Sequence, residues 1–175
     1  MPPERIAIFI DGSYVFHISQ RFRQGWRIDY YKLVATLTGS SRQLVRTYFY
    51  TSIAVPPSPA QVRFHHALSN LGFTVVTRPL RPRRDGWMEK GIDVALVTDF
   101  VGLAFRNAYD TAVLVSGDSD YVGTVEEVKR LGKKVEVAAF DSGVAAELKA
   151  SADRYISLET IAESIELGPQ KTQDS

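Results

Sequence analysis

The chain has 175 residues, of which 45% are hydrophobic and 23% charged, proportions that are ordinary for a soluble globular protein. Its length fits one domain with a substantial buried core. With 21 Lys and Arg against 20 Asp and Glu, the formal net charge is +1, so binding of nucleic acid would require a local basic patch. The sequence has no cysteine, which excludes disulfides, zinc–thiolate sites and thiol catalysis.

Neither a secretory leader nor a membrane-spanning segment is expected. The first apolar run, IAIFIDG, is too short for the hydrophobic region of a signal peptide and ends at an acid. No apolar run approaches the roughly 18 residues that a transmembrane helix needs. We therefore expect a cytoplasmic protein that does not interact with a membrane.

Short apolar runs alternate with helical patterns along the whole chain. The runs predict strands at residues 5–10, 44–53, 73–77, 112–116, 134–140 and 155–157. The helical patterns cover residues 14–22, 59–70, 90–107, 144–150 and 158–165. Two more helices are expected, one that begins at Asp29 as its cap and ends near Gly39, and one that follows Tyr121. Ser58 is the expected cap of the helix at 59–70. This alternation predicts an α/β fold, a mainly parallel sheet covered by helices on both faces.

Two segments break the pattern. Residues 78–88 (RPLRPRRDGWM) contain four arginines, two prolines and a glycine, and we expect an exposed loop there. Residues 168–175 (GPQKTQDS) are polar, and we expect a disordered tail after a single domain at 1–167. In the strand at 44–53, Tyr48 and Tyr50 look exposed, which indicates either a homodimer surface or ordinary packing.

The central stretch is Thr111 to Tyr121, TAVLVSGDSDY. Its first half suits a strand that is buried on both faces, and its second half places Asp118 and Asp120 at the carboxyl end of that strand. Ser119 or Asp120 is the expected N-cap of the following helix. In open α/β sheets ligands bind beyond the carboxyl ends of the strands, and a hard divalent cation would stabilise a pair of carboxylates there.

Other acids are expected at the same edge. Asp11 follows the first strand, and Asp93 lies in the first turns of the helix at 90–107. Asp99 is six residues further on and cannot share a helix face with Asp93, so we expect it to be solvated or bonded within its own helix. The prediction is an acidic pocket of Asp11, Asp93, Asp118 and Asp120. Taken singly, each residue has another explanation: a turn for Asp11, stabilisation of the helix dipole for Asp93, and for Asp118 and Asp120 a helix cap and a solvated side chain.

The segments IFIDGSYVF, KGIDVALVTDF and TAVLVSGDSDYVGTVEEVKRLGKKVEV resemble the NYN family of PIN-like nucleases, in particular its LabA-like branch, over residues 6–158. The resemblance implies a three-layer α/β/α, PIN-like fold and a metal-dependent ribonuclease site. By motif, the catalytic and metal-binding residues are Asp11 of DG, Asp93 of KGxD, and Asp118 and Asp120 of SGDSD. The first family motif commonly reads D-G-x-N, whereas here Tyr14 stands at the Asn position.

One or two Mg²⁺ or Mn²⁺ ions held by these aspartates could activate water and neutralise a phosphodiester. The hydroxyls of Ser13, Ser116 and Ser119 are expected to orient the carboxylates or the bound water. A serine nucleophile is disfavoured, because no histidine follows a triad pattern. For His17, His65 and His66 we expect surface or packing roles.

The RNA would be held by basic and aromatic residues between the third strand and the helix at 90–107. Phosphate contacts and base stacking are expected from Arg78, Arg81, Arg83, Arg84, Trp87 and Lys90. The alternatives are a solvated basic loop, with Trp87 packed on the body, and an ion pair between Lys90 and Asp93.

The favoured function is thus a Mg²⁺- or Mn²⁺-dependent endoribonuclease acting on single-stranded RNA. The alternative is an inactive RNA-binding or regulatory module. A phosphatase of the haloacid dehalogenase type is disfavoured, because Gly12-Ser13 follows Asp11 where that class has a DxD motif.

Overall fold

The computed structural model describes residues 1–168, so the predicted tail lies outside the described residues from position 169 onward. Its centre is a six-stranded sheet in the order β3-β2-β1-β6-β7-β8, in which every neighbouring pair is parallel. The strands are β1 (Glu4–Asp11), β2 (Arg42–Ile53), β3 (Thr74–Pro79), β6 (Thr111–Val115), β7 (Lys134–Ala139) and β8 (Arg154–Ser157). All six predicted strands are therefore present, and β1 and β6 lie side by side in the middle of the sheet.

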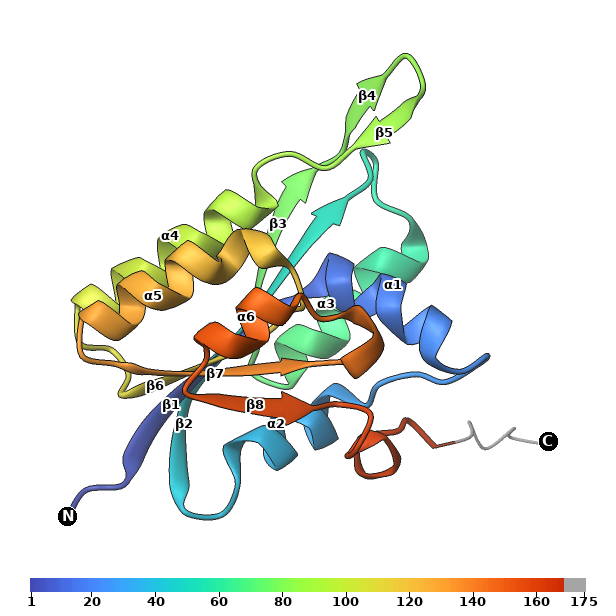
Figure 1. Ribbon diagram of the computed structural model, residues 1–175. Coiled ribbons are helices and arrows are strands. Elements are labelled where there is room, and N and C mark those ends of the chain that lie inside the picture. Colours follow the sequence, from blue (N-terminus) through green and yellow to red (C-terminus); the bar gives the residue numbers. More distant parts are fainter. Residues whose placement is uncertain (169–175) are drawn as a thin grey trace.

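Helices cover both faces of the sheet, as Figure 1 shows. On one face lie α1 (Gly12–Phe22), α2 (Tyr30–Thr38) and α3 (Pro59–Asn70). On the other lie α4 (Ile92–Phe105), α5 (Val122–Arg130) and α6 (Ala146–Ser151). The predicted three-layer α/β/α architecture is confirmed. None of the helices in the described part combines the length and apolar character that crossing a membrane requires.

Alternate side chains of the central strands enter the two halves of the core. Ile6, Ile8 and Ile10 of β1 face the α1–α3 layer, whereas Ala7 and Phe9 face the α4–α6 layer. All of them are almost fully buried. A strand buried on both faces reads as a continuous apolar run, which is why β1 and β6 were recognisable in the sequence.

Local capping signals fix several helix ends. The side chain of Asp29 accepts the N–H of Lys32 and caps α2, which ends at Gly39 as predicted. Ser58 and Gln61 form a capping box at the start of α3, also as predicted for Ser58. These caps are local, so sequence spacing was sufficient to find them.

Two tyrosines of β2 differ from prediction. Tyr50 is almost fully buried and Tyr48 is half-buried, because their side of β2 is covered by α4. The Tyr48 ring stacks on Phe9 with centroids 5.1 Å apart. The two rings are therefore less exposed than their sequence suggested, and ordinary packing, one of the two alternatives, accounts for them.

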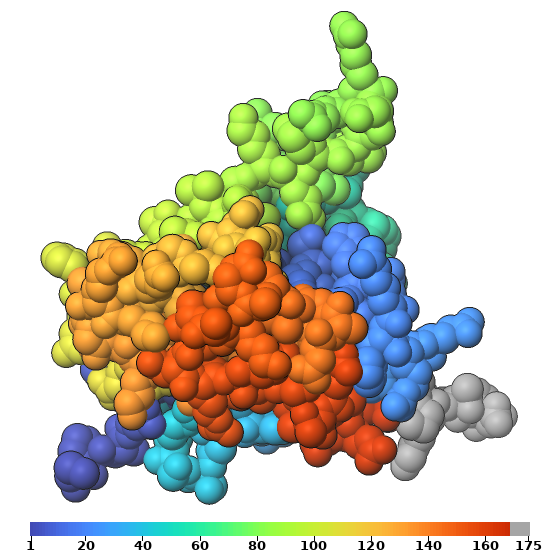
Figure 2. Space-filling view, viewed as in Figure 1, coloured from blue at the N-terminus to red at the C-terminus, as the bar shows by residue number. Residues whose placement is uncertain are grey.

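The segment after β3 is not an irregular loop. It forms a hairpin of β4 (Arg81–Arg83) and β5 (Gly86–Met88), which projects from the body of the protein (Figures 1 and 2). Each strand has three residues, too few for a periodic pattern in the sequence. The predicted last helix, at 158–165, is instead a turn followed by a 3₁₀ helix, η3 (Ala162–Ser164). Leu158, Ala162 and Ile165 are nevertheless buried in the core, which explains their helix-like spacing.

Candidate active site

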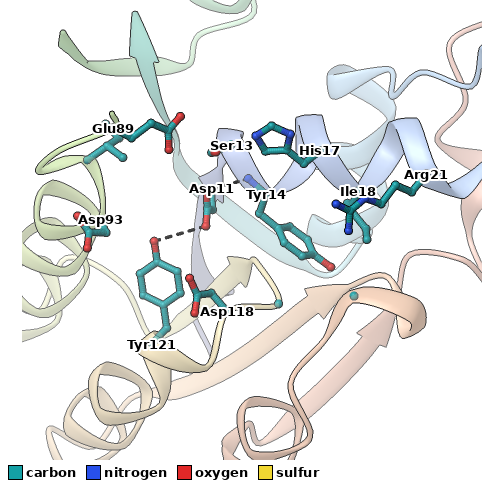
Figure 3. A pocket seen from close by; sticks show the side chains of 13 residues that line it. Asp11, Ser13, Tyr14, His17, Ile18, Arg21, Glu89, Asp93, Asp118 and Tyr121 are labelled. Carbon is teal, nitrogen blue, oxygen red and sulfur yellow. Dashed lines mark hydrogen bonds between the residues drawn. The ribbon is translucent and has the colours of Figure 1, made fainter. Parts of the chain in front are cut away.

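An acidic cavity of about 560 Å³ opens at the carboxyl edge of the sheet. Four carboxylates line it: Asp11, Glu89, Asp93 and Asp118. They come from the end of β1, the loop before α4, the first turn of α4 and the loop after β6. Figure 3 shows the four side chains around a common space, with Asp11 lying between Glu89 and Asp93 on one side and Asp118 on the other. Because β1 and β6 are adjacent, the fold brings their acids together.

Asp11 is half-buried, whereas the other three carboxylates belong to exposed residues. Its Oδ1 accepts the N–H of Tyr14 at 3.1 Å, so Asp11 caps α1. Its Oδ2 accepts the hydroxyl of Ser116 at 2.9 Å and that of Tyr121 at 3.4 Å. Burial raises the pKa of Asp11, and the nearby charge of Asp118 raises it further, although the bonds from Tyr14 and Ser116 partly oppose this.

The turn after β6 is built on Ser116. Its buried hydroxyl donates to Asp11 and accepts the N–H of Asp118 at 3.3 Å, so it connects the two acids. Asp118 in turn accepts the N–H of Asp120 at 3.0 Å and caps the 3₁₀ helix η1 (Ser119–Tyr121) that precedes α5. The predicted caps Ser119 and Asp120 were wrong, because the chain makes a 3₁₀ turn before α5 begins.

Gly117 is required by a close approach of two loops. A Cβ at this position would lie 1.8 Å from the carbonyl oxygen of Gly143, in the loop after β7. Any side chain at position 117 would push that loop away or move Asp118. The glycine of the SGDSD motif is thus explained by packing next to the site.

Asp93 is positioned by the start of α4. Gly91 has a φ of 83° as the N-cap, a left-handed conformation that favours glycine, and α4 begins at Ile92. Asp93 in the first turn reaches the acidic cavity, as predicted. Asp99 faces elsewhere and accepts the hydroxyl of Tyr50 at 2.9 Å, so it is neither solvated alone nor bonded within its helix.

Not every predicted site residue lines the cavity. Ser13 does, whereas Asp120 and Ser119 are exposed and lie outside the lining. Ser116 lies behind Asp11, to which it is bonded. For Asp120, Ser13 and Ser119 the roles remain predictions from the sequence.

Three polar residues of the cavity lining were not found from the sequence, namely Glu89, Arg21 and Tyr121. Tyr14 and His17 also line it, although the sequence singled out Tyr14 only as a departure from the family motif and His17 only for a surface or packing role. The only signal for Glu89 was its place directly before the KGxD motif. The Tyr14 hydroxyl accepts the N–H of Phe140 at 3.0 Å, and burial raises its pKa to about 12. Tyr14 therefore ties α1 to the end of β7, a long-range role that no local pattern reveals.

The residues predicted to bind RNA are all exposed, and most lie on the β4–β5 hairpin. In its register Pro82 is opposite Trp87 and Arg81 is opposite Met88. Side chains alternate along a strand, so Trp87 faces one side of the hairpin and the arginines of β4 face the other. The Trp87 side chain is 66% exposed and does not pack on the body, contrary to the alternative interpretation. Arg78 lies near the end of β3, before the hairpin. Arg84 lies in the turn of the hairpin, and Lys90 lies after β5.

The lining of the cavity suits a divalent cation that keeps part of its hydration shell better than one that is enclosed by protein ligands alone. Within residues 1–168 no three His, Asp or Glu side chains are close enough to hold one ion together. However, the charge of Asp118 contributes to the raised pKa of Asp11, so the two carboxylates repel each other, and a cation between them would offset that repulsion. Mg²⁺ typically keeps several waters and takes only one or two carboxylates, together with oxygens of a phosphate substrate. The oxygen donors present match that mode of binding.

Comparisons with known proteins agree with this description. The NYN domain family matches residues 5–159. The chain is 32% identical over 171 residues to the low amplitude and bright protein LabA of Synechococcus elongatus, covering 94% of this chain and 89% of that protein. It also matches the crystal structure of a protein of unknown function from Vibrio parahaemolyticus, with a TM-score of 0.79 and 30% identity over 94% of this chain and 97% of the other.

The family match and the fold confirm the resemblance drawn from the DG, KGxD and SGDSD motifs. An NYN domain implies a PIN-like fold of the kind found in nucleases and RNA-binding proteins. The match spans the whole sheet from β1 to β8, including all four acids of the cavity. The chain therefore belongs to the NYN domain family.

Proposed function

We propose that the protein is a divalent-metal-dependent endoribonuclease that hydrolyses single-stranded RNA. One observation carries this proposal: four carboxylates from separate elements converge on one cavity at the carboxyl edge of the sheet. Such a concentration of negative charge disfavours binding of a phosphate backbone unless a cation is also bound. Membership of a nuclease family supports the same conclusion.

Asp11 and Asp118 are the residues that would hold Mg²⁺ or Mn²⁺, with Asp93 and Glu89 facing them across the cavity. A bound divalent cation supplies an activated water and neutralises the phosphoryl oxygens. Ser116 holds the Asp11 carboxylate in place through its hydroxyl. Asp120 is retained in the proposal on its motif alone.

The projecting hairpin supports the assignment of RNA as the substrate. Arg81, Arg83 and Arg84 are exposed and free to contact phosphates. The exposed ring of Trp87, on the side of the hairpin away from Arg81 and Arg83, can stack on a base of a strand that passes around the hairpin. The hairpin connects β3 to the loop that carries Glu89, so RNA bound there would lie close to the acidic cavity. A flexible single strand suits this arrangement, because its bases are available for stacking.

The test is cleavage of a labelled single-stranded RNA in Mn²⁺, Mg²⁺ or EDTA by wild type, Asp118→Asn and Asp120→Asn. We expect metal-dependent cutting that falls by roughly 100-fold or more in Asp118→Asn, as loss of a metal ligand should exceed the effect of an outer-shell change. We expect a much smaller loss in Asp120→Asn, because Asp120 lies outside the cavity lining. Equal cutting by wild type and Asp118→Asn would remove Asp118 from the site and indicate a contaminant.

A regulatory RNA-binding module is the second candidate. It is favoured by the wide spacing of the carboxylates and by Tyr14 at the position of the family's Asn. RNA binding by wild type without cutting in either metal would support this alternative against the nuclease.

A further inference from the structure

A second cavity, of about 350 Å³, adjoins the acidic one. Ser13, His17 and Glu89 line both cavities, so these residues form the border between them. Figure 3 shows the three side by side along the edge of the acidic cavity that lies away from Asp118 and Tyr121. A group that occupied the second cavity would therefore lie next to whatever occupies the first. We call it the aromatic cavity.

We propose that the aromatic cavity binds the nucleobase of a nucleotide next to the scissile phosphate. This inference rests on the proposed nuclease function, because that function places an RNA backbone in the acidic cavity. The volume is at the lower end of the range of about 300–1,000 Å³ for ligand pockets, which suits one base with its sugar rather than a larger ligand.

Aromatic rings on two helices give the cavity its stacking surfaces. Phe16 of α1 is 60% exposed and Phe64 of α3 is 38% exposed. The Phe64 ring is held by an edge contact with Phe49 and a tilted contact with Tyr30, two more buried rings whose centroids each lie 5.7 Å from that of Phe64. A ring fixed in this way offers a face for stacking without a large loss of side-chain entropy on binding. Proteins that bind single-stranded RNA recognise splayed bases on such aromatic faces.

Polar side chains in the lining of the aromatic cavity are available for hydrogen bonds to the edge of a base. Ser52 lines the cavity, is only 7% exposed, and its Oγ has no hydrogen-bond partner among residues 1–168. A buried hydroxyl without a partner costs free energy, and a small shift of this side chain toward the cavity surface would let a base supply the missing donor or acceptor. Gln61 also lines the cavity, and its side chain is held by the capping box with Ser58. These polar groups distinguish the cavity from an apolar groove suited to a protein partner.

The test compares the binding of two fluorescent single strands of about eight nucleotides, a length within the range of known single-strand sites. One is an ordinary RNA, and the other is a ribose-phosphate strand that lacks the bases. Both are titrated with the full chain in Ca²⁺ at one fixed salt concentration, because phosphate contacts make the affinity depend on salt. The variants are Phe16→Ala, Ser52→Ala and, as a matched control, Phe105→Ala. Phe105 is also an exposed phenylalanine, 78% exposed at the end of α4, and lines neither cavity.

We expect Phe16→Ala to weaken binding of the ordinary RNA by about 5- to 100-fold, as for loss of a stacked base. It should leave binding of the base-free strand unchanged, and Phe105→Ala should change neither. Ser52→Ala should alter the preference among oligo-A, -C, -G and -U while keeping thermal stability. Equal losses on both strands, or no loss with Phe16→Ala, would overturn the inference.

Cleavage in Mn²⁺, measured in parallel, separates the two proposals. Base-dependent binding that requires Phe16, without any cutting, would refute the nuclease and keep the base site. Cutting of RNA at an equal rate by wild type and Phe16→Ala, with equal binding, would keep the nuclease and refute the base site.

Discussion

Ser116→Ala removes the hydrogen-bonding group behind the acidic cavity while leaving its four carboxylates in place. The Ser116 hydroxyl is fully buried, donates to Asp11 at 2.9 Å and accepts the N–H of Asp118 at 3.3 Å. A hydrogen bond to a charged group contributes about 1.5–3 kcal/mol, and a bond as long as the second adds at most about 0.5 kcal/mol. We therefore expect the free energy of unfolding to fall by about 2–3 kcal/mol, which for a chain of this size lowers Tm by roughly 4–12 °C.

The same change should weaken the binding of Mn²⁺. Outer-shell partners of metal ligands typically contribute 10- to 100-fold to affinity or activity, so we expect a shift of roughly that size in the Mn²⁺ concentration that gives half-maximal cleavage. Calorimetric titration of the unliganded protein provides a second readout that does not depend on turnover.

Ser119→Ala is the matched control, because Ser119 belongs to the same motif but is exposed and lies outside the cavity lining. It should change neither Tm nor the Mn²⁺ response. If Ser116→Ala lost stability but kept the Mn²⁺ midpoint, Ser116 would be a structural residue only. If both variants behaved like wild type, the hydrogen bonds assigned to Ser116 would not position Asp11.

Two further predictions concern the turn after β6 and the hairpin. Gly117→Ala should lower the free energy of unfolding in urea by about 3 kcal/mol, the upper end of the usual cost of overpacking, because its Cβ would overlap the Gly143 carbonyl. Gly123→Ala, with open space around its Cβ in α5, should instead stabilise by about 0.5–1 kcal/mol, and equal effects would refute the packing argument. Replacing Arg81 and Arg83 by Gln should reduce the salt dependence of RNA binding, with the slope of log K against log [salt] falling by about 0.7 for each phosphate that is no longer neutralised. Arg130→Gln, on the exposed side of α5, should leave that slope unchanged, and an unchanged slope in the hairpin variant would exclude the arginines from RNA binding.

The central strands could be predicted from the sequence because they carry strong local signals. β1 and β6 are buried on both faces and appear in the sequence as continuous apolar runs. β1 ends at Asp11, and Asp118 follows soon after the end of β6. If these strands are assumed to be neighbours in a parallel sheet, Asp11 and Asp118 are predicted to lie at the same edge of that sheet. Asp93 is predicted there too, because the N-terminus of α4 meets the same edge. The positions of these three residues thus depend on local patterns and one topological rule.

The rest of the site depends on contacts between distant segments. Glu89 reaches the cavity because the β4–β5 hairpin returns the chain there, and a three-residue strand has no readable period. Tyr14 and Tyr121 are placed by bonds to Phe140 and Asp11, more than 100 positions away in sequence. The capping role of Asp118, in place of Ser119 or Asp120, follows from a 3₁₀ turn that propensity alone does not distinguish from the start of an α-helix.

The four acids differ in how firmly they are held. Asp11 is half-buried and accepts three hydrogen bonds, whereas Glu89, Asp93 and Asp118 are exposed. A fixed carboxylate surrounded by exposed ones could accept a cation without prior assembly of a cage. The exposed side chains of Glu89 and Asp93 can reorient at little cost, whereas Asp118 would give up its bond to the Asp120 N–H. Under the proposed function, these movements would be needed for the carboxylates to share a divalent cation, because among the described residues no three acids are close enough to hold one together. Under the same proposal, the stability of the site should depend on Ser116 and Asp11, and its affinity for metal on Asp118 as well.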